Sequence, residues 1–428
     1  MIERCYWLET LSTSDVASLK TDGGPLPAHV DVVVIGGGYT GLAAARRLAM
    51  RGASVLVLER GDLGSGASSR SAGQVLTGLK VDAATLVAKY GERRAVELFE
   101  VGRRAIADLE AVIAEESIDC DYERCGHLAA AAKASHFDVL RDEQALLARV
   151  FGHRVELLSR ADQRSEIGSE MYHGVAIDEA SRAINPAKYV AGLAAAARRR
   201  GACLASHADV TGLRRGGDRW RVSTPRGEVI AGDVLAATNG YTGPVTPALQ
   251  RRLVPIGSYI IATDPLTDDR ASALLPKRRV AFDTKHFLFY FRVTKDRRLL
   301  FGGRAEFGAP TPDATRRAAA ILRRGMTTIF PSLADAPVAY GWSGRVAFTR
   351  DEMPHAGRID GVHVAAGYCG HGIAMATHLG DAIACRMAGD TAPHPLMDRP
   401  WPAIPLYGGR PWFLPLVGAY YKVLDWLT

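Results

Sequence analysis

A run of apolar residues opens into a glycine pattern at residues 30–42, VDVVVIGGGYTGL, and this stretch decides the fold. The apolar run predicts a buried strand, and the spacing of Gly36, Gly38 and Gly41 matches the pattern G-x-G-x-x-G. An alanine-rich helix follows, and SVLVLE at residues 54–59 then predicts a second strand that ends on an acid, Glu59. Strand, glycine turn, helix, strand and acid in this order are typical of a doubly wound α/β fold.

Each part of this unit has a physical role in holding a dinucleotide. Gly36 allows the chain to turn tightly off the strand, Gly38 lets a pyrophosphate approach bare backbone, and Gly41 lets the helix pack closely on the sheet. The N-terminus of the helix offers unpaired N–H groups to the phosphates. Glu59 can accept hydrogen bonds from a ribose 2′-hydroxyl. The sequence therefore predicts a dinucleotide-binding domain.

Length and composition favour an enzyme of two packed domains. A chain of 428 residues is too long for one compact core, and 47% hydrophobic with 23% charged residues is ordinary for a globular protein. The net charge of +7 comes from basic residues scattered in pairs, such as Arg46-Arg47 and Arg93-Arg94. Such pairs are typical of solvated helix faces, and no nucleic-acid partner is expected.

The six cysteines show neither metal-ligand nor redox spacing, so we expect reduced thiols, no metal site and a cytoplasmic protein. No signal peptide begins the sequence, and no apolar run of about 20 residues predicts a transmembrane segment. The most apolar stretch, residues 412–421, is short and contains Pro415, which favours docking on the body of the protein.

The rest of the chain divides by its pattern. Residues 61–74 form a loop of small residues suited to lie against a flat polar ligand, and residues 82–150 show helical periodicity. A short strand at 174–178 precedes a helix from Asn185-Pro186, a good N-cap and first-turn pair, to Arg200. Strands are further expected at 203–210, at 220–223 and at 229–236 before a small-residue turn.

From about residue 250 to 345 the pattern alternates as in an antiparallel sheet, and residues 362–372 return to a strand followed by glycines. We therefore expect an α/β protein whose Rossmann-like domain is assembled from separated segments, with a second α+β substrate domain carrying a large antiparallel sheet. The expected division is 1–85, 150–245 and 345–395 for the first domain, 86–149 and 246–344 for the second, and 396–428 as a C-terminal extension on the body.

Four features together resemble the D-amino-acid oxidase-like superfamily of FAD-dependent amine oxidases. They are the unit from Gly36 to Glu59, the loop 64–74, the turn 237–240 (ATNG) and Gly370-His371-Gly372. Within this superfamily the chain is most similar to the γ-glutamylputrescine oxidase branch, through GGGYTGL at 36–42, YFR at 290–292, LLFGG at 299–303 and GWSG at 341–344. The likeness covers nearly the whole chain from about Tyr6.

The resemblance implies FAD as cofactor, with the adenosine near Glu59 and the flavin between the domains. The residues implied to contact it are Gly36, Gly38, Tyr39, Thr40, Gly41, Glu59, Arg60, Ser65, Ala67, Ser68, Ser69, Ala72, Gly73, Gln74, Val210, Thr238, Asn239, Gly240, Trp342, Gly344, Gly370, His371, Gly372, Ile373 and Ala374. Helix N-termini favour negative charge, so the one at 370–373 suits the pyrimidine end of the ring. His371 then either faces the flavin or merely caps its helix.

The implied chemistry is oxidation of the C–N bond of a primary or secondary amine, γ-glutamylputrescine being one candidate, to an imine that hydrolyses to an aldehyde. The cofactor performs the difficult step, so no nucleophile or triad is needed. Candidate catalytic residues are His371, Tyr290 and Arg304; Tyr290 either positions the amine or packs in a domain interface, and Arg304 either holds a carboxylate or forms a structural ion pair.

Two departures from relatives matter. Some relatives bind flavin through a cysteine soon after the Trp-x-Gly segment, but residues 345–350 contain none, so non-covalent FAD is expected. Others place a lysine near the flavin for reaction with oxygen, and residues 287–305 contain only Lys295. Molecular oxygen, giving hydrogen peroxide, and a quinone or protein acceptor therefore both stay open. A tRNA-modifying flavoprotein and a non-catalytic FAD subunit are further alternatives, and the oligomeric state is not predicted.

Overall fold

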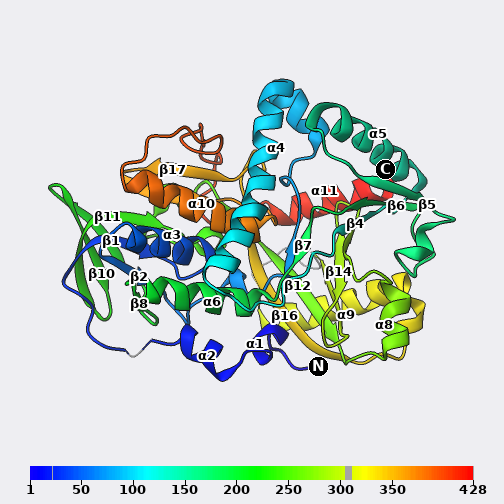
Figure 1. Cartoon of the computed structure of the whole chain (residues 1–428), viewed down its shortest axis with the longest axis horizontal. Coiled ribbons are helices and arrows are strands. Elements are labelled where there is room, and N and C mark those ends of the chain that lie inside the picture. The colour runs from blue at the N-terminus through cyan, green and yellow to red at the C-terminus, as the bar shows by residue number, and fades with distance from the viewer. Residues whose placement is uncertain (22, 304–310, 428) are drawn as a thin grey trace.

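Two large sheets lie next to each other, the first on the left of Figure 1 and the second on the right. The computed structural model describes residues 1–21, 23–303 and 311–427, and these contribute eight strands to each of the two sheets. Helix α4 (Ala83–Glu115), with a break at Gly91, stands near their junction. The α/β class with a Rossmann-like domain and a second domain, expected from the sequence, is confirmed.

The first sheet is built around parallel strands from distant parts of the chain. Its order is β17 (His355–Ile359), β18 (Val362–Ala366), β11 (Gly227–Ala236), β1 (His29–Ile35), β2 (Val55–Leu58) and β8 (Cys203–Ala205), with β9 (Gly212–Gly216) and β10 (Arg219–Thr224) joined to β11. All neighbours from β18 to β8 pair parallel. The helices α3 (Tyr39–Met50), α6 (Pro186–Arg199) and α10 (Gly372–Met387) pack beside it. The Rossmann-like sheet is thus assembled from separated segments.

The capping signal that the sequence predicted at Asn185-Pro186 is present at the start of α6. The side chain of Asn185 accepts hydrogen bonds from the N–H groups of Ala187 and Lys188, and Pro186 occupies the first turn of α6. An Asn cap and a Pro at the first helical position satisfy or remove the N–H groups that a helix start leaves unpaired. This local chemistry fixes where α6 begins.

The second sheet is antiparallel apart from one parallel pair, β13 with β4. Its order is β16 (Val338–Phe348), β12 (Val254–Thr263), β15 (Leu299–Gly303), β14 (Phe289–Val293), β13 (Val280–Asp283), β4 (His127–Ala130), β6 (Gly174–Asp178) and β5 (Glu156–Ser159). One face packs Phe291 and Phe301 into a core with α8 (Asp268–Leu274) and α9 (Pro312–Ile329). The opposite face is free to form a site.

The remaining α-helices and strands lie outside the two large sheets. They are α1 (Tyr6–Glu9), α2 (Thr13–Leu19), the pair β3 (Gln74–Val75) and β7 (Arg182–Ala183), α5 (Ala134–Phe151), α7 (Pro247–Gln250) and α11 (Leu414–Leu427). The C-terminal segment contacts the second sheet's region, since Asp425 accepts hydrogen bonds from the N–H groups of His286 and Phe287. Within the described chain, no helix is both long and apolar enough to cross a membrane.

The sheet topology departs from the expected division at two places. Residues 82–150 contain strand β4 between α4 and α5, where helical periodicity predicted no strand. Strands β5 and β6 pair with β4 in the second sheet, although residues 150–245 were grouped with the first domain. The physical reason is non-local: β4 and β6 are short apolar segments, and their place is decided by the strands with which they pair.

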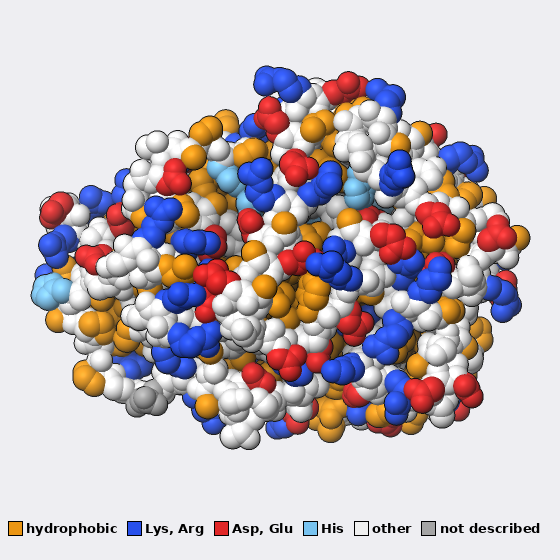
Figure 2. Space-filling view, in the orientation of Figure 1, with side chains coloured by type: hydrophobic (Ala, Val, Ile, Leu, Met, Phe, Trp, Pro, Cys, Tyr) orange, Lys and Arg blue, Asp and Glu red, His pale blue; other side chains and the backbone are white. Residues whose placement is uncertain are grey.

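One arginine pair also differs from expectation. On the face shown in Figure 2, basic and acidic side chains are interspersed, but Arg46 is fully buried rather than part of a solvated helix face. Its Nε donates to Glu116 at 2.7 Å, and Arg199 and Arg200 also pair with Glu116. Burial alone would raise the pKa of Glu116, but hydrogen bonds from these arginines lower it to about 2. This cluster joins the ends of α4 and α6 to α3.

The carboxyl group of Asp283, at the end of β13, makes the stability of the fold sensitive to pH. Burial raises its pKa to about 6, despite Lys285 and the N–H of Phe289 at 3.0 Å. The folded state therefore binds a proton more tightly than the unfolded chain, and this group's stabilisation is lost as pH rises from about 4 through 6. As pH rises from 4.5 to 7, we expect the free energy of unfolding to fall less for Asp283→Asn than for wild type.

Denaturant unfolding at several pH values measures this difference. Asp142→Asn, an exposed aspartate on α5, is the matched control and should follow the wild-type pH curve. Parallel curves for Asp283→Asn and wild type would contradict the assignment.

Candidate functional site

A cavity of about 1230 Å³ lies where the carboxyl ends of β1, β2 and β11 meet the open face of the second sheet. The strand ends contribute Ile35, Leu58 and Ala236, and the second sheet contributes Phe282 and Tyr290 among others. Ligands in open α/β sheets bind beyond the carboxyl ends of the strands. A single small-molecule site typically measures about 300–1,000 Å³, so this cavity has room for more than one ligand group.

Most of the residues that the sequence assigns to the cofactor line this cavity. They are Gly36, Gly38, Tyr39, Thr40, Glu59, Arg60, Ser65, Ala67, Ser68, Ala72, Gln74, Val210, Thr238, Asn239, Gly344, Gly370, His371, Gly372 and Ile373. Of the others, Gly41, Ser69, Gly73, Gly240, Trp342 and Ala374 lie outside the lining. Among the candidate catalytic residues, Tyr290 and His371 line the cavity, and Arg304 falls outside the described residues.

The glycine turn leaves no room for side chains. Gly36 has a φ of +109°, and a Cβ there would lie 2.9 Å from the carbonyl oxygen of Ala237. A Cβ on Gly41 would lie 1.9 Å from the carbonyl oxygen of Gly36, and one on Gly38 would lie 2.8 Å from Ser68 Oγ. Helix α3 begins after Gly38, which has no side chain to cap it, and the N–H of Tyr39 donates to Ser68 Oγ at 3.1 Å. Bare backbone and the N-terminus of a helix thus face the cavity, an arrangement suited to phosphate groups.

Glu59 stands at the end of β2 beside this turn. One carboxylate oxygen accepts the N–H of Gly37 at 2.8 Å and the other accepts the N–H of Gly61 at 3.0 Å. These bonds fix the orientation of the carboxylate. Since an ionised carboxylate has about four lone-pair sites, it can still accept hydroxyl groups from the cavity.

Aromatic side chains hold the small-residue loop, residues 61–74, by hydrogen bonds to its carbonyl oxygens. Tyr39 donates to the carbonyl oxygen of Ser68 at 2.5 Å, and the indole of Trp7 donates to that of Ser71 at 2.8 Å. Trp342 is buried and donates to the carbonyl oxygen of Arg70 at 2.9 Å. The sequence predicts that Trp342 contacts the flavin, which stays a prediction; in the structure its ring packs in a cluster with Trp7 and Ile260. The hydrogen bond from Trp342 thus ties β16 to the loop.

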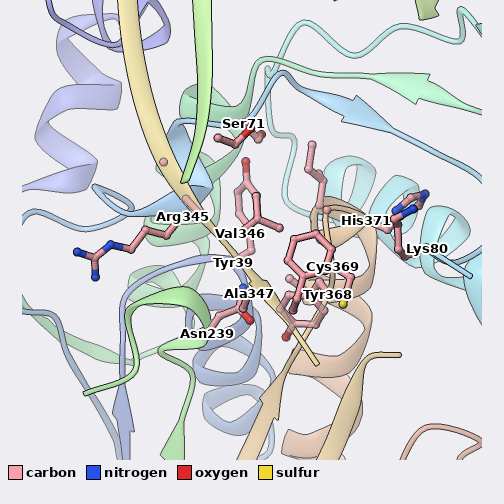
Figure 3. Close-up of a pocket in the computed structure, with 18 of the residues that line it drawn as sticks. Tyr39, Ser71, Lys80, Asn239, Arg345, Val346, Ala347, Tyr368, Cys369 and His371 are labelled. Carbon is pink, nitrogen blue, oxygen red and sulfur yellow. The ribbon is translucent and has the colours of Figure 1, made fainter. Parts of the chain in front are cut away.

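His371 lies at the N-terminus of α10 and its side chain makes no cap hydrogen bond. Its Nδ1 atom is buried without a hydrogen-bond partner among the described residues. Burial lowers the pKa of His371 to about 3, and the charges of Lys80 and His127 act in the same direction. Figure 3 shows His371 and Lys80 together at one side of the labelled residues. The imidazole is therefore neutral at ordinary pH, and the capping alternative does not describe it.

Neighbouring residues at the start of α10 are equally fixed. The hydroxyl groups of Tyr368 and Thr40 lie 2.6 Å apart, which ties α10 to the first turn of α3. Cys369 lines the cavity, but its thiol donates to the carbonyl oxygen of Gly367, and burial raises its pKa to about 11. A thiol that stays protonated is a poor nucleophile. This chemistry agrees with the expectation of non-covalent FAD, which stays a prediction.

The second sheet supplies the other wall because its residues alternate between two faces. His127 and Ala129 on β4, Ala176 and Asp178 on β6, and Phe282 on β13 all line the cavity. Their chain neighbours Leu128, Val175, Ile177 and Ala281 lie in the core on the opposite face. Successive side chains of a strand point to opposite faces. The wall is thus a direct result of the period-two pattern.

Tyr290 lies flat on this wall. Its hydroxyl is 2.8 Å from Ser258 Oγ on β12, and a Cβ on Gly302 would lie 2.2 Å from its ring. Gly302, on the intervening strand β15, therefore makes space for the ring to cross to β12. The sequence identified Tyr290 but gave no sign of this partner.

Several lining residues were not predicted from the sequence. Lys80, Glu143, His127, the pair His153–Asp178 and Arg345 all line the cavity. No local motif surrounds them, so the signal that reveals them is their place in the fold. Lys295, the lysine considered for a role near the flavin, lies outside the lining, with its Nζ 3.5 Å from Asp121.

Comparison with known proteins identifies the family of this chain. The model of the DAO family, described as FAD dependent oxidoreductase, matches residues 31–386. The chain belongs to this family and is an FAD-dependent oxidoreductase. It is 34% identical over 401 residues to the γ-glutamylputrescine oxidoreductase of Escherichia coli, and this match covers 92% of each chain. It is also 32% identical to the probable oxidoreductase OrdL of Haemophilus influenzae, over 85% of this chain and 84% of that one.

Solved structures agree in fold. Glycine oxidase from Geobacillus kaustophilus matches with a TM-score of 0.73 and 21% identity, covering 86% of this chain and 97% of that one. L-proline dehydrogenase from P. horikoshii matches with a TM-score of 0.70 and 21% identity, covering 92% and 99%. At this identity the likeness shows the fold alone.

The residues that line the cavity fit FAD in their chemistry. The bare backbone of Gly36 to Gly38 and the start of α3 suit a pyrophosphate, and the carboxylate of Glu59 suits a ribose. At the other helix start, the unpartnered Nδ1 of His371 is a buried polar atom that a heterocyclic ring with donors and acceptors can satisfy. Both helix N-termini face one cavity, which suits an anionic cofactor.

Substitution of Gly41 by alanine tests the glycine turn. We expect Gly41→Ala to hold less than about a tenth of the wild-type flavin, because a methyl group 1.9 Å from Gly36 O forces α3 away from β1. Flavin absorbance per protein measures the effect, and circular dichroism reports whether the fold is retained. The control is Gly216→Ala, whose Cβ meets open space. Normal flavin content in Gly41→Ala would refute this account of the turn.

The neutral state of His371 can be tested by pH. Because its pKa lies at about 3, His371 gains no proton between pH 5 and 9. We expect His371→Asn to change the rate of flavin reduction without changing the shape of its pH dependence over this range. Stopped-flow reduction at a series of pH values measures the shape. Disappearance of an ionisation near pH 6–7 in the variant would show that the imidazole titrates there.

Proposed function

We propose that the protein oxidises the C–N bond of a primary or secondary amine, with γ-glutamylputrescine as the candidate substrate. One observation carries the proposal: the dinucleotide cradle opens directly into a chamber walled by the second sheet, in a chain 34% identical to a γ-glutamylputrescine oxidoreductase along 92% of its length. The amine loses two electrons and two protons to give an imine, and water converts the imine to an aldehyde. Oxygen takes up the electrons and protons as hydrogen peroxide.

Within this proposal the first sheet binds the cofactor. Gly36, Gly38 and the start of α3 would hold the pyrophosphate, Glu59 the ribose of the adenosine, and residues 370–373 the pyrimidine end of the flavin. When bound, FAD supplies a hydride acceptor for the α carbon of the amine and a route for its electrons to oxygen. The N-terminus of α10 favours negative charge near it by its partial positive charge.

The second sheet orients the substrate and keeps water away. Phe282, Leu288 and Ile260 give the chamber an apolar wall, and the hydroxyl of Tyr290, held by Ser258, is a polar group on that wall. Tyr290 would orient the amine nitrogen. The burial that keeps His371 neutral disfavours an ammonium group at the same end, so the amine would react there in its free form. Arg304 stays a candidate from the sequence.

A cytoplasmic location is part of the same proposal. All six cysteines are free thiols in the structure, and three of them, Cys5, Cys120 and Cys369, are buried.

Flavin absorbance without oxygen tests the function. We expect γ-glutamylputrescine, in a panel of amines and amino acids, to bleach the purified holoenzyme, and air to restore the colour within seconds with release of hydrogen peroxide. Bleaching with slow recovery in air would replace oxygen by a quinone or protein acceptor. A flavin that no amine reduces would overturn the proposal in favour of a non-catalytic FAD subunit or a different substrate class, such as a modified base in tRNA.

A further inference from the structure

A second cavity, of about 280 Å³, shares no lining residue with the cofactor cavity. Its walls are α1, the segment 121–123, the start of α6 and the segment from the end of β14 to residue 296. Its lining carries three cations and three carboxylates: Lys188, Arg292, Lys295, Asp121, Glu123 and Asp296. These side chains come from three separate stretches of the chain, so their meeting is a property of the fold.

Arg292 is the buried cation of this cavity, with 3% of its surface exposed. Its Nη1 donates to the carbonyl oxygens of Ile184 at 2.9 Å and Gly73 at 3.2 Å. The guanidinium carbon also lies 5.6 Å from the centre of the Trp7 ring, a cation–π distance. One corner of the guanidinium thus holds the loop 61–74, and the rest of the group remains for another partner.

The other edge of the guanidinium lacks a partner. Within residues 1–21, 23–303 and 311–427, Arg292 forms no ion pair, and its Nε and Nη2 atoms have no hydrogen-bond partner. Neither atom is sealed in the interior, as Arg46 Nη1 is, so both reach the cavity that Arg292 lines. Burial lowers the pKa of Arg292 in spite of the charge of Glu123. Because buried charges in proteins are normally paired, this edge points to a bound anion.

The carboxylates of the cavity are already engaged. Each pairs with a basic side chain: Asp121 with Lys188 at 3.0 Å, Glu123 with Arg278 at 3.4 Å and Asp296 with Arg298 at 2.9 Å. The side chain of Lys295 is 79% exposed, so water solvates its charge. Arg292 is therefore the buried cation that a ligand can neutralise, and one negative charge is enough. The three carboxylates nearby repel a dianion such as sulfate or phosphate more strongly than a monoanion.

We propose that this second cavity binds a small monocarboxylate, whose two oxygens accept the N–H groups at Nε and Nη2 of Arg292. These two donors lie side by side on one edge of the guanidinium, and such an edge matches the two oxygens of a carboxylate. Pockets for small molecules begin at about 300 Å³, so the ligand has only a few carbons. The site is separate from the proposed amine oxidation, since it shares no residue with the cofactor cavity.

Occupation of this site also supports the loop that borders the cofactor cavity. The guanidinium that binds the carboxylate donates to Gly73, and the neighbouring indole of Trp7 donates to the carbonyl oxygen of Ser71 at 2.8 Å. A ligand that neutralises Arg292 removes the cost of its buried charge in the folded state. Binding to the folded state alone raises the temperature of unfolding as the ligand concentration rises.

Simple anions test the site in the holoenzyme. Acetate, chloride and sulfate are titrated at equal ionic strength, with isothermal titration calorimetry and thermal unfolding as readouts and the visible spectrum of the flavin recorded in parallel. We expect acetate to bind saturably and to raise the unfolding temperature, and chloride and sulfate to bind about 10-fold more weakly, since neither fits the two donors and the single charge together. The flavin spectrum should not change, because the ligand lies outside the cofactor cavity.

Variants of Arg292 locate the bound anion. Arg292→Lys keeps a cation that can reach the carbonyl oxygens of Gly73 and Ile184 but lacks the two-donor edge, so acetate should bind about 10-fold more weakly while the flavin is retained. Arg292→Gln should abolish acetate binding, and circular dichroism reports whether it folds. The control is Arg93→Lys, an arginine on α4 whose side chain is 92% exposed, which should bind acetate as wild type does.

Four results would overturn the inference. One is a wild-type holoenzyme that acetate neither binds nor stabilises, and another is sulfate or chloride binding as tight as that of acetate. The third is equal acetate affinity in Arg292→Lys and wild type. The fourth is a change in the flavin spectrum on acetate binding, which would place the ligand in the cofactor cavity. None of these results depends on whether an amine reduces the flavin, so the inference and the proposed function fail separately.

Discussion

The close approach of α3 to the first sheet is the constraint on which the site depends. A Cβ on Gly41 would stand 1.9 Å from the carbonyl oxygen of Gly36, so the helix reaches its position only because that side chain is absent. Helix α10 meets α3 in the same way, since a Cβ on Gly380 would lie 2.6 Å from Thr40 O. The contact between Tyr368 and Thr40 then fixes the N-terminus of α10 beside that of α3. Two helix starts thereby face one cavity.

The second sheet closes that cavity through its alternating faces. Core side chains such as Phe291 and Phe301 hold α9 on one side, while Tyr290 and Phe282 line the cavity on the other. A shift of register by one residue would exchange the two sets. The chemistry of the chamber is therefore tied to the same pairing that stabilises the domain, and Gly302 is needed in that pairing to let Tyr290 lie across the sheet.

Much of the site could be predicted because its signals are local. The glycine spacing of residues 36–41 and the acid at Glu59 follow from steric and hydrogen-bonding needs within a few turns of chain. Position 371 was likewise visible as part of a strand, glycine and helix pattern. The hydrogen bond of Trp342 to Arg70 O could not be predicted, because a buried aromatic gives no indication of which loop it will contact. Arg46 was misplaced for a related reason, since its carboxylate partners are about 70 residues away in sequence.

By itself, the sequence determined the dinucleotide unit, the start of α6 and the existence of a second, β-rich domain. These depend on periodicity, capping and the absence of side chains, which act between residues close in the chain. Only the tertiary structure decided that β4, β5 and β6 belong to the second sheet and that Lys80, Glu143 and His127 line one cavity. Such meetings depend on the pairing of distant strands, and no residue pattern within a single segment encodes where its partner will lie.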